Sequence, residues 1–481
     1  MKLLISFLFA TLALASILRP QKILDIERHA VHDCLESANE TVGILNFVDS
    51  SEHYEKGAKH YSGYLDVKSK NRLFFWLQLS KINPAKDPII LVLNGGPGAS
   101  SMYGMIIQWG SMVFPWRIDK LTVNPNALNA AANVVFVDNP IGVGFSQPAP
   151  SGSLHKQLLD CTKDLVEFLL ALRVTDFRGV QLVKNELHVM GSSFAGHYLA
   201  DLGAFVSATP GLNDALQLKS LIMGNPALED IRGLDATYSL VCDPTVALSL
   251  SLLLTDDQCK VWKDNIPKCA AAIAACRKAP ASAACAEGTI EGVCGQADPW
   301  VYWKLTCRDP YDISEPRVWD APRRENIPAA KKFLDLYTKE IGAEGAWAMF
   351  QPKVRTALRD SGEAYKDSSI RIQDMLTTKG NNIKLFAYAG DYDLMCPYLG
   401  LKRTLRDIQW DGQKELATKL DRSEADYDKL LTVAGTPLGN YAEAGPLRYA
   451  RIFGSGHMGN EKRGGDVRAM IYQWIGIKSH L

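Results

Sequence analysis

Short apolar segments alternate with amphipathic segments along most of this chain. A short apolar run between polar residues is typical of a strand that is covered on both faces. Such runs predict strands at 88–93, 134–137, 187–190, 221–223, 383–388 and 449–453. Alternating aromatic residues at 61–79 predict an antiparallel hairpin, and helical spacing predicts helices at 160–172 and 198–206. Because strands alternate with helices, the pattern predicts an α/β fold with a doubly wound, mostly parallel sheet.

The region 235–330 departs from this pattern. It contains seven of the ten cysteines and no run that predicts a buried strand. We therefore expect a helical, disulfide-rich insertion that divides the core into 16–234 and 331–481. Such an insertion could cover an active site, or it could contribute to stability alone. The spacing does not fix which cysteines pair, and the absence of a C-x-x-C pair opposes a zinc cluster.

The N-terminus resembles a secretory signal peptide over residues 1–15. Lys2 is its positive end, 3–14 its apolar stretch, and 13–15 a small-residue cleavage site. An N-terminal membrane anchor is the alternative, although the apolar run is short for a membrane span. We expect a secreted chain, or one delivered to a vacuole or lysosome, with no span after signal removal. The Asn39 sequon predicts a glycosylation site there.

The charge balance is even, with 53 basic and 53 acidic residues. A formal net charge of zero argues against a nucleic-acid or acidic-membrane partner. Ten cysteines fit an oxidising compartment. No motif implies a metal or an organic cofactor, so we expect neither.

The segment 191–196, Gly-Ser-Ser-Phe-Ala-Gly, carries the strongest candidate chemistry. It lies between a predicted strand and a predicted helix, which is the layout of a nucleophile elbow around Ser193. The N–H groups at the start of the helix would face a developing negative charge. The match to G-x-S-x-G is imperfect, because Ala195 takes the second glycine position and Gly196 comes one residue later. A purely structural turn is the alternative.

A serine nucleophile needs a base, and the base needs an orienting carboxylate. In a fold of this kind the chain order is serine, acid, histidine. Asp391 and Asp393 follow the predicted strand 383–388, at the sheet edge where ligands bind. Three histidines follow Ser193: His197, His457 and His480. The glycine-rich loop 454–459 favours His457 as the base, whereas His197 falls within a helix.

A second glycine-rich loop, 94–98, follows the predicted strand 88–93. An oxyanion hole needs backbone N–H donors, and we expect one from Phe194 and one from this loop. The loop lacks the Gly-Lys-Ser/Thr ending of a phosphate-binding loop, so we do not interpret it as one.

With these residues in place, the chain resembles the serine carboxypeptidase family of α/β-hydrolases, and in particular its carboxypeptidase Y-like members. The matching motifs lie at 61–65, 93–98, 138–146 and 224–226, and the resemblance extends from about 61 to 474. It implies an α/β-hydrolase fold in which Ser193 is the nucleophile, Asp393 the acid and His457 the base. It also implies that Gly96 and Phe194 supply the oxyanion N–H groups.

The cysteines match the family's arrangement as well. The resemblance implies an unpaired thiol at Cys396, near the site. It also implies three disulfides: Cys276–Cys285 nested inside Cys269–Cys294, and Cys242–Cys259. Ala99 stands where the family has a half-cystine, which leaves Cys307 without that partner. The partners of Cys34 and Cys161 stay open.

The residues expected to bind substrate depart from the family pattern. Ser192 and Gln108 replace two glutamates that typically share a proton and, with the residue matching Asn94, hold the substrate's C-terminal carboxylate. An amide and a hydroxyl can still donate hydrogen bonds. The result would be a neutral, less pH-dependent clamp, or no clamp at all. The candidate substrate-binding residues are Asn94, Gly95, Gln108, Ser192, Cys396 and Met458.

The resemblance implies a secreted serine carboxypeptidase-type hydrolase that removes C-terminal residues from peptides through an acyl-enzyme. The first alternative is an acyltransferase or esterase acting on small-molecule acyl donors. The second is a binding protein that has lost catalysis.

Overall fold

The computed structural model describes residues 45–115, 119–246, 254–295, 299–316, 326–422, 429–433 and 435–478. The predicted signal peptide, Cys34, Asn39 and His480 lie outside these ranges. No helix of the described part is both long and apolar enough to cross a membrane.

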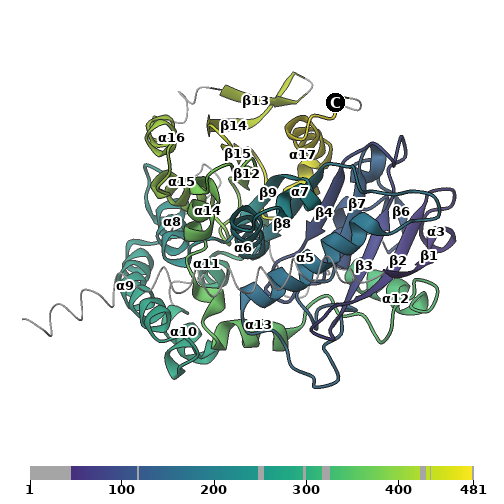
Figure 1. Ribbon diagram of the computed structural model, residues 1–481. Helices are drawn as coiled ribbons and strands as arrows, with labels where there is room; N and C mark the ends of the chain where they lie inside the picture. Colours follow the sequence, from purple (N-terminus) through teal and green to yellow (C-terminus); the bar gives the residue numbers. More distant parts are fainter. Residues whose placement is uncertain are drawn as a thin grey trace, which may run out of the picture.

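A single large sheet forms the centre of the molecule (Figure 1). Its strand order is β1-β2-β3-β7-β4-β8-β9-β12-β15-β14-β13. The strands are β1 (Asn46–Asp49), β2 (His60–Asp66), β3 (Arg72–Gln78), β4 (Ile89–Leu93), β7 (Asn133–Val137), β8 (Leu187–Ser193), β9 (Leu218–Pro226), β12 (Lys384–Gly390), β13 (Lys429–Val433), β14 (Thr436–Ala444) and β15 (Leu447–Ile452). Neighbours from β7 to β15 are parallel, and antiparallel pairs close both edges. This confirms the predicted α/β fold and its mostly parallel sheet.

Helices cover both faces of the sheet, which explains why its central strands are apolar throughout. Leu91 and Leu93 of β4 face the core under α5 (Leu158–Val174), α6 (Ala195–Ala208) and α14 (Ser369–Thr377). Ile90 and Val92 face the opposite core. Elements on that side are α4 (Ser101–Gly104), η1 (Met105–Trp109), α12 (Asn326–Leu336) and α17 (Asn460–Trp474).

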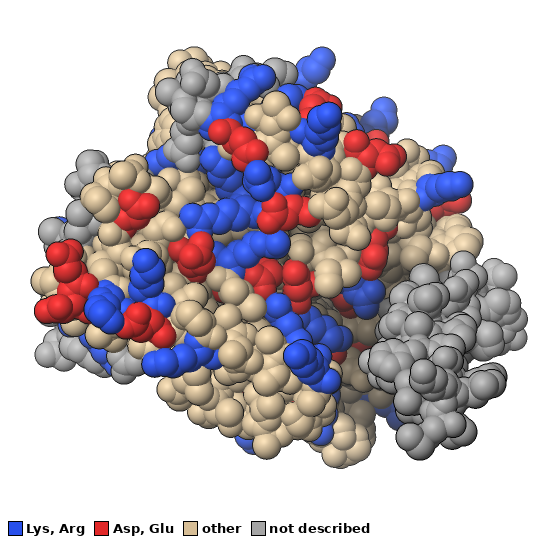
Figure 2. Space-filling model, turned by 90° about the vertical axis from the view of Figure 1, so that its left-hand side faces the viewer, with Lys and Arg blue, Asp and Glu red and all other residues tan. Residues whose placement is uncertain are grey.

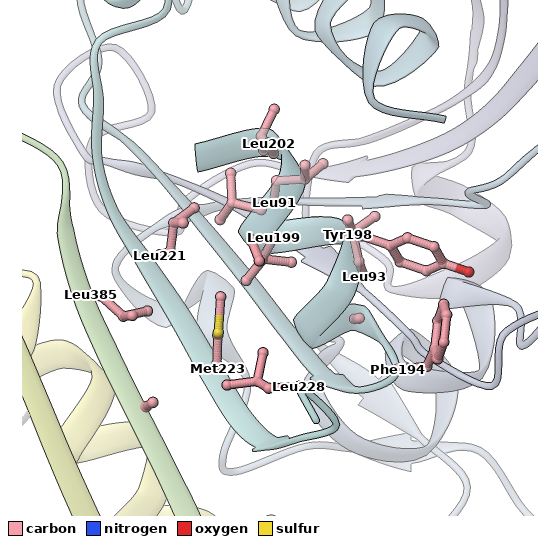
Figure 3. Close-up of a cluster of buried hydrophobic side chains, with 14 of the residues drawn as sticks. Leu91, Leu93, Phe194, Tyr198, Leu199, Leu202, Leu221, Met223, Leu228 and Leu385 are labelled. Carbon is pink, nitrogen blue, oxygen red and sulfur yellow. The ribbon is translucent and has the colours of Figure 1, made fainter. Parts of the chain in front are cut away.

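Figure 3 shows the first core at the point where α6 begins. Tyr198, Leu199 and Leu202 of this helix lie over leucines of β4 and over Leu221 and Met223 of β9. All of these side chains are buried. The start of α6, and with it Ser193, is therefore held by apolar packing on the sheet.

The cysteine-rich region is mainly helical. It contains α8 (Asp230–Cys242), α9 (Asp256–Lys278), η3 (Ala283–Cys285), α10 (Glu287–Cys294) and α11 (Pro299–Thr306). A short hairpin of β10 (Arg308–Asp309) and β11 (Asp312–Pro316) follows, which the apolar pattern did not predict because neither strand is an apolar run. The boundaries placed at 234 and 330 stay predictions.

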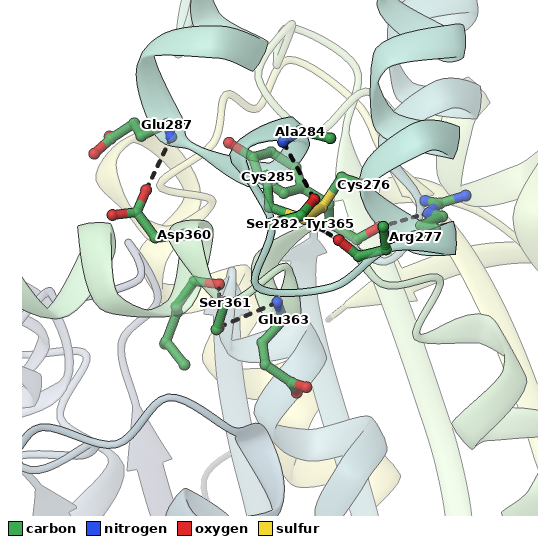
Figure 4. Close-up of a disulfide and its surroundings, with 12 residues drawn as sticks. Cys276, Arg277, Ser282, Ala284, Cys285, Glu287, Asp360, Ser361, Glu363 and Tyr365 are labelled. Atoms are coloured by element: carbon green, nitrogen blue, oxygen red, sulfur yellow. Dashed lines mark hydrogen bonds between the residues drawn. A yellow bond between two sulfur atoms is a disulfide. The ribbon is translucent and has the colours of Figure 1, made fainter.

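Three disulfides hold this region together: Cys242–Cys259, Cys269–Cys294 and Cys276–Cys285. They are the pairs that the family resemblance implied. The local hydrophobic cluster is small, so the cross-links supply stability that packing does not. Figure 4 shows Cys276–Cys285 tying α9 to η3, beside the Arg277 guanidinium that donates to the Tyr365 carbonyl. Cys161, Cys307 and Cys396 are free thiols.

The remaining elements connect these parts. They are α3 (Ser51–Tyr54), β5 (Met112–Val113), β6 (Thr122–Val123), η2 (Leu128–Ala130), α7 (Leu212–Leu216), α13 (Pro352–Asp360), η4 (Glu363–Tyr365), α15 (Tyr398–Asp407) and α16 (Gln413–Leu420). Basic and acidic side chains are interspersed on the face seen in Figure 2. Ion pairs such as Arg403–Asp235 and Arg406–Asp421 fit this mixture.

Candidate active site

Ser193 occupies a strained turn between β8 and α6. Its φ is +62°, a left-handed conformation that costs an L-residue about 1–2 kcal/mol. The Ser193 carbonyl accepts a hydrogen bond of 3.0 Å from the Ala227 nitrogen, which ties the turn to the end of β9. A strained serine held at a strand-to-helix turn has the geometry of a nucleophile elbow.

The packing around the turn explains its unusual glycine spacing. A Cβ on Gly196 would lie 2.7 Å from the Ala227 carbonyl oxygen and 2.8 Å from the Pro226 Cβ. A Cβ on Gly191 would lie 2.7 Å from the Ala195 Cβ. Glycines are therefore needed at 191 and 196, whereas Ala195 is tolerated because Gly191 lies opposite it.

The loop after β4 lies directly against this turn. A Cβ on Gly95 would lie 2.5 Å from the Phe194 nitrogen and 2.7 Å from the Ser192 carbonyl oxygen. Only glycine permits this approach. The approach brings the predicted oxyanion residues, Gly96 and Phe194, to one cavity together with Ser193.

His457 and Asp393 form a buried pair. The distance between His457 Nδ1 and Asp393 Oδ2 is 2.7 Å, and Asp393 is fully buried. Burial by itself disfavours the charged imidazole, but the Asp393 carboxylate outweighs it and raises the pKa of His457 well above its usual value. A buried carboxylate that holds one ring nitrogen leaves the other available for proton transfer.

Further donors fix the Asp393 carboxylate. The Asn225 side-chain amide donates to Oδ2 at 2.7 Å. The Met395 and Cys396 nitrogens donate to Oδ1 at 2.8 and 3.2 Å. Asn225 was not among the predicted site residues, although its position at the end of a strand could have indicated it.

The sheet topology explains how these residues meet. Strands β8, β9, β12 and β15 are consecutive and parallel, so their carboxyl ends share one edge. In that order they supply Ser193, Asn225, Asp393 and His457. Residues far apart in sequence therefore converge at the edge where open α/β folds bind ligands.

Asp391, the other candidate acid, holds a loop instead. Its Oδ1 accepts hydrogen bonds from the Gly454 and Ser455 nitrogens at 2.8 and 3.4 Å. Its Oδ2 lies 3.3 Å from Arg451. These contacts fix the start of the glycine-rich loop that carries His457.

His197 lies beneath the elbow. Its ring stacks on Phe194 with centroids 4.3 Å apart, and its Nδ1 lies 2.6 Å from the Ser368 hydroxyl. Burial lowers the pKa of His197 to about 3. A neutral, packed histidine supports the backbone next to Ser193 and makes no contact with Asp393.

The Cys396 thiol lies beside the pair. Burial raises the pKa of this thiol, whereas the neighbouring His457 and Ser193 act to lower it. In the described part of the chain, Asp393, Cys396 and His457 form the one group of three potential metal ligands within 4.8 Å of one another. The 2.7 Å hydrogen bond between His457 and Asp393 already occupies one ligand atom of each, which favours proton transfer over coordination.

The expected carboxylate-binding residues lie in three separate sets of contacts. The Gln108 amide, on η1, donates to the Met458 sulfur at 3.4 Å. The Asn94 side chain packs against Gly104, where a Cβ would lie 2.4 Å from Asn94 Oδ1. Ser192 and Tyr388 both lie against Gly224, whose Cβ would be 3.2 Å from Ser192 Oγ and 2.6 Å from the Tyr388 hydroxyl. Tyr388 is a polar side chain beside Gly224 that the sequence analysis did not predict.

A cavity of about 520 Å³ adjoins Ser193. Gly96, Pro97, Phe194 and Cys396 line it near Ser193. Its other wall comes from Leu234 of α8 and from the disulfide-rich insertion, including Ile273, Ile290 and Cys294. The insertion therefore contributes directly to the space in which a substrate would lie.

The sequence is similar to those of known carboxypeptidases. Carboxypeptidase Y homolog A from Trichophyton rubrum is 28% identical over 423 residues, covering 84% of this chain and 72% of that protein. Carboxypeptidase Y from Candida albicans is 28% identical over 429 residues, covering 87% and 73%.

A solved structure shares the fold. The prohormone-processing carboxypeptidase KEX1(delta)P from Saccharomyces cerevisiae has a TM-score of 0.68 at 18% identity, covering 90% of this chain and 95% of that one. The family model described as serine carboxypeptidase matches residues 52–476. The chain belongs to the serine carboxypeptidase family.

Proposed function

We propose that this protein is an active serine carboxypeptidase that releases the C-terminal residue of a peptide. The observation that carries the proposal is the His457–Asp393 pair, oriented by Asn225 at the same sheet edge as the strained Ser193. Membership of the family supports the same reaction class.

In the proposed mechanism Ser193 Oγ attacks the carbonyl carbon while His457 takes the hydroxyl proton. Asp393 holds the ring and stabilises its charged form. The N–H groups of Gly96 and Phe194 stabilise the oxyanion. His457 then returns the proton to the leaving amine, and water hydrolyses the acyl-enzyme by the same steps.

The substrate's C-terminal carboxylate would meet neutral donors. Gln108 offers an amide, Ser192 a hydroxyl, and Tyr388 a phenol that stays protonated because burial raises its pKa. None of these groups must gain a proton before it can donate a hydrogen bond. We infer a carboxylate clamp that does not require acidic pH.

The altered clamp also favours a second candidate function, acyl transfer or ester hydrolysis on small molecules. Both expected glutamates are absent, and the remainder of the site can act on any acyl donor that fits the cavity. Such an enzyme would not require a free carboxylate on its substrate.

We infer entry into the secretory pathway and secretion, with a vacuole or lysosome as the alternative destination. The signal-like residues 1–15 and three disulfides support this inference.

The first experiment is incubation of a mixed peptide library with the purified protein from pH 4 to 8, followed by mass spectrometry. We expect stepwise loss of C-terminal residues, and no loss with Ser193→Ala. Intact peptides together with fluorophosphonate labelling of Ser193 would instead favour an acyltransferase or esterase. Labelling of the wild type but not of Ser193→Ala would exclude a binding protein that has lost catalysis.

A further inference from the structure

Asp230 presents a carboxylate without a partner to the cavity that contains Ser193. It is the first residue of α8, it is partly buried, and it lines the cavity wall. Among the residues that the structure describes, none forms a hydrogen bond or an ion pair with this carboxylate.

The charged neighbours of Asp230 are already engaged with one another. Glu229 accepts hydrogen bonds from the Arg277 guanidinium and from the Arg232 nitrogen, both at 2.7 Å. Arg359 lies 2.9 Å from Glu287 and also contacts Glu291. Asp230 therefore has no ion-pair partner among the described residues of this wall, to which Glu229, Glu291, Lys304 and Arg359 also contribute.

Burial makes that anion costly. Removal from water raises the pKa of Asp230 to about 6. Among the charged groups that face it, Glu229 and Asp367 raise the pKa further, whereas Arg277 and Arg359 lower it. A cation that entered the cavity would relieve the cost of this buried charge.

The lining of the cavity indicates which side of the scissile bond it receives. Gly96, Ser193 and Phe194 line it, but Asn94, Gln108, Ser192 and Met458 do not. Asn94, Gln108 and Ser192 are the candidates for binding the substrate's C-terminal carboxylate, so we place that carboxylate outside this cavity, although the candidate substrate-binding residue Cys396 lines it. The cavity is left for the side chain on the acyl side.

We propose that this cavity binds the side chain of the residue preceding the scissile bond, and that Asp230 selects lysine or arginine there. The proposal rests on the proposed carboxypeptidase activity. The long aliphatic stem of such a residue would pack on Leu234, Ile273, Ile290 and Leu401, with its charged end at Asp230. A volume of about 520 Å³ lies within the range of small-ligand pockets and accommodates such a side chain.

Asp230 also lies in the first turn of α8, where a carboxylate interacts favourably with the helix dipole. A purely structural role would affect stability and leave selectivity unchanged. Asp235 on the same helix is exposed and pairs with Arg403, so Asp235→Asn is a matched control.

The test compares two blocked dipeptides with a common C-terminal leucine, one with lysine and one with norleucine before it. Norleucine retains the aliphatic stem but not the charge. We expect the wild-type protein to favour lysine at least tenfold in kcat/KM at pH 7.5, with the ratio falling below pH 6. Asp230→Asn should bring the ratio close to one, chiefly through slower cleavage of the lysine peptide, whereas Asp235→Asn should retain the ratio. A wild-type ratio near one, or an unchanged ratio in Asp230→Asn, would overturn the proposal.

A binding measurement separates this proposal from the proposed activity. Ser193→Ala is titrated with the same two peptides at pH 7.5 and pH 5. We expect about tenfold tighter binding of the lysine peptide at pH 7.5 only. Equal binding at both pH values would overturn the selectivity even if both peptides are cleaved. Failure of the wild type to cleave either peptide would overturn the carboxypeptidase activity, because the norleucine side chain has no charge for Asp230 to select.

Discussion

The side-chain amide of Gln108 donates a hydrogen bond to the sulfur of Met458, 350 residues away in the chain. Met458 follows His457, so this contact links the expected carboxylate clamp to the loop that carries the base. An amide has the same charge at every working pH, whereas a glutamate in its place would titrate. If residue 108 binds the substrate's carboxylate, we expect the pH dependence of that binding to change when Gln108 is replaced by glutamate.

Restoring the two acids tests the neutral clamp. We expect Ser192→Glu with Gln108→Glu to raise the rate of cleavage of free-acid peptides near pH 4–5, because a carboxylic acid that retains its proton can donate to the substrate carboxylate. The measurement is kcat/KM from pH 4 to 8, on a peptide acid and on the matching peptide amide. The rate of cleavage of the peptide amide should not increase. An unchanged pH profile for the peptide acid would show that residues 108 and 192 do not bind the substrate's carboxylate.

Asp393 should set the acid limb of the pH–rate profile. His457 must be neutral to accept a proton, and the Asp393 carboxylate raises the pKa of this buried imidazole. We expect the wild-type kcat/KM to decrease as the pH is lowered through the pKa of His457, which lies above 6.5. The profile should therefore show no optimum at acidic pH. Asp393→Asn should lower kcat by about 10³–10⁴-fold and move the limb to lower pH. A limb that stays in place would mean that another group titrates.

The His457–Asp393 pair also contributes to the stability of the folded protein. Because its pKa is raised in the folded state, protonated His457 contributes stability that is fully present below about pH 6.5, the unfolded pKa. That contribution is lost as pH rises through the folded pKa. We expect the free energy of unfolding of the wild type, relative to His457→Gln, to decrease over this upper range. Urea unfolding of both proteins at several pH values gives the difference.

Asn225 is predicted to position the acid. Its amide donates to Asp393 Oδ2 at 2.7 Å, and its own φ is +45°. Asn225→Gly retains this backbone conformation and removes the amide, leaving a buried acceptor short of one donor at a cost of about 1–3 kcal/mol. We expect kcat to fall about 10–100-fold with little change in KM. Asn225→Ala is the comparison for backbone strain, and a fall in melting temperature without a fall in kcat would indicate a structural role only.

The Cys269–Cys294 cross-link should stabilise the insertion. It closes a loop of 25 residues between α9 and α10, and loop-closure entropy predicts a loss of about 3–4 kcal/mol when it is removed. Both cysteines also line the cavity next to Ser193. We expect the double alanine variant to unfold at lower urea concentration and to discriminate less between substrates. Cys161→Ala, which removes a buried free thiol, is the control.

The sequence was sufficient for the parts of the fold that depend on local pattern. The runs IILVL in β4 and NVVFV in β7 are buried on both faces, and the Gly-Ser-Ser-Phe turn lies where strand passes into helix. Partners that meet only through tertiary structure were not predictable in this way. Asn225 contacts an acid 168 residues later, and Ser192 and Tyr388 lie on either side of Gly224 because β8 and β12 both pair with β9. The disulfide pairs followed from the family resemblance, because spacing alone allows many pairings.

The insertion enters the chain after β9, and β12 is the next strand of the large sheet, so the wall that the insertion adds to the cavity is encoded between Asn225 and Asp393. The register of the parallel strands is fixed by the sheet itself, independently of what lies between them. Mutations in the insertion can therefore alter substrate specificity while the candidate catalytic groups keep their spacing. We expect proteins encoded by duplicated genes for such a chain to diverge first in substrate specificity and only later in the reaction that they catalyse.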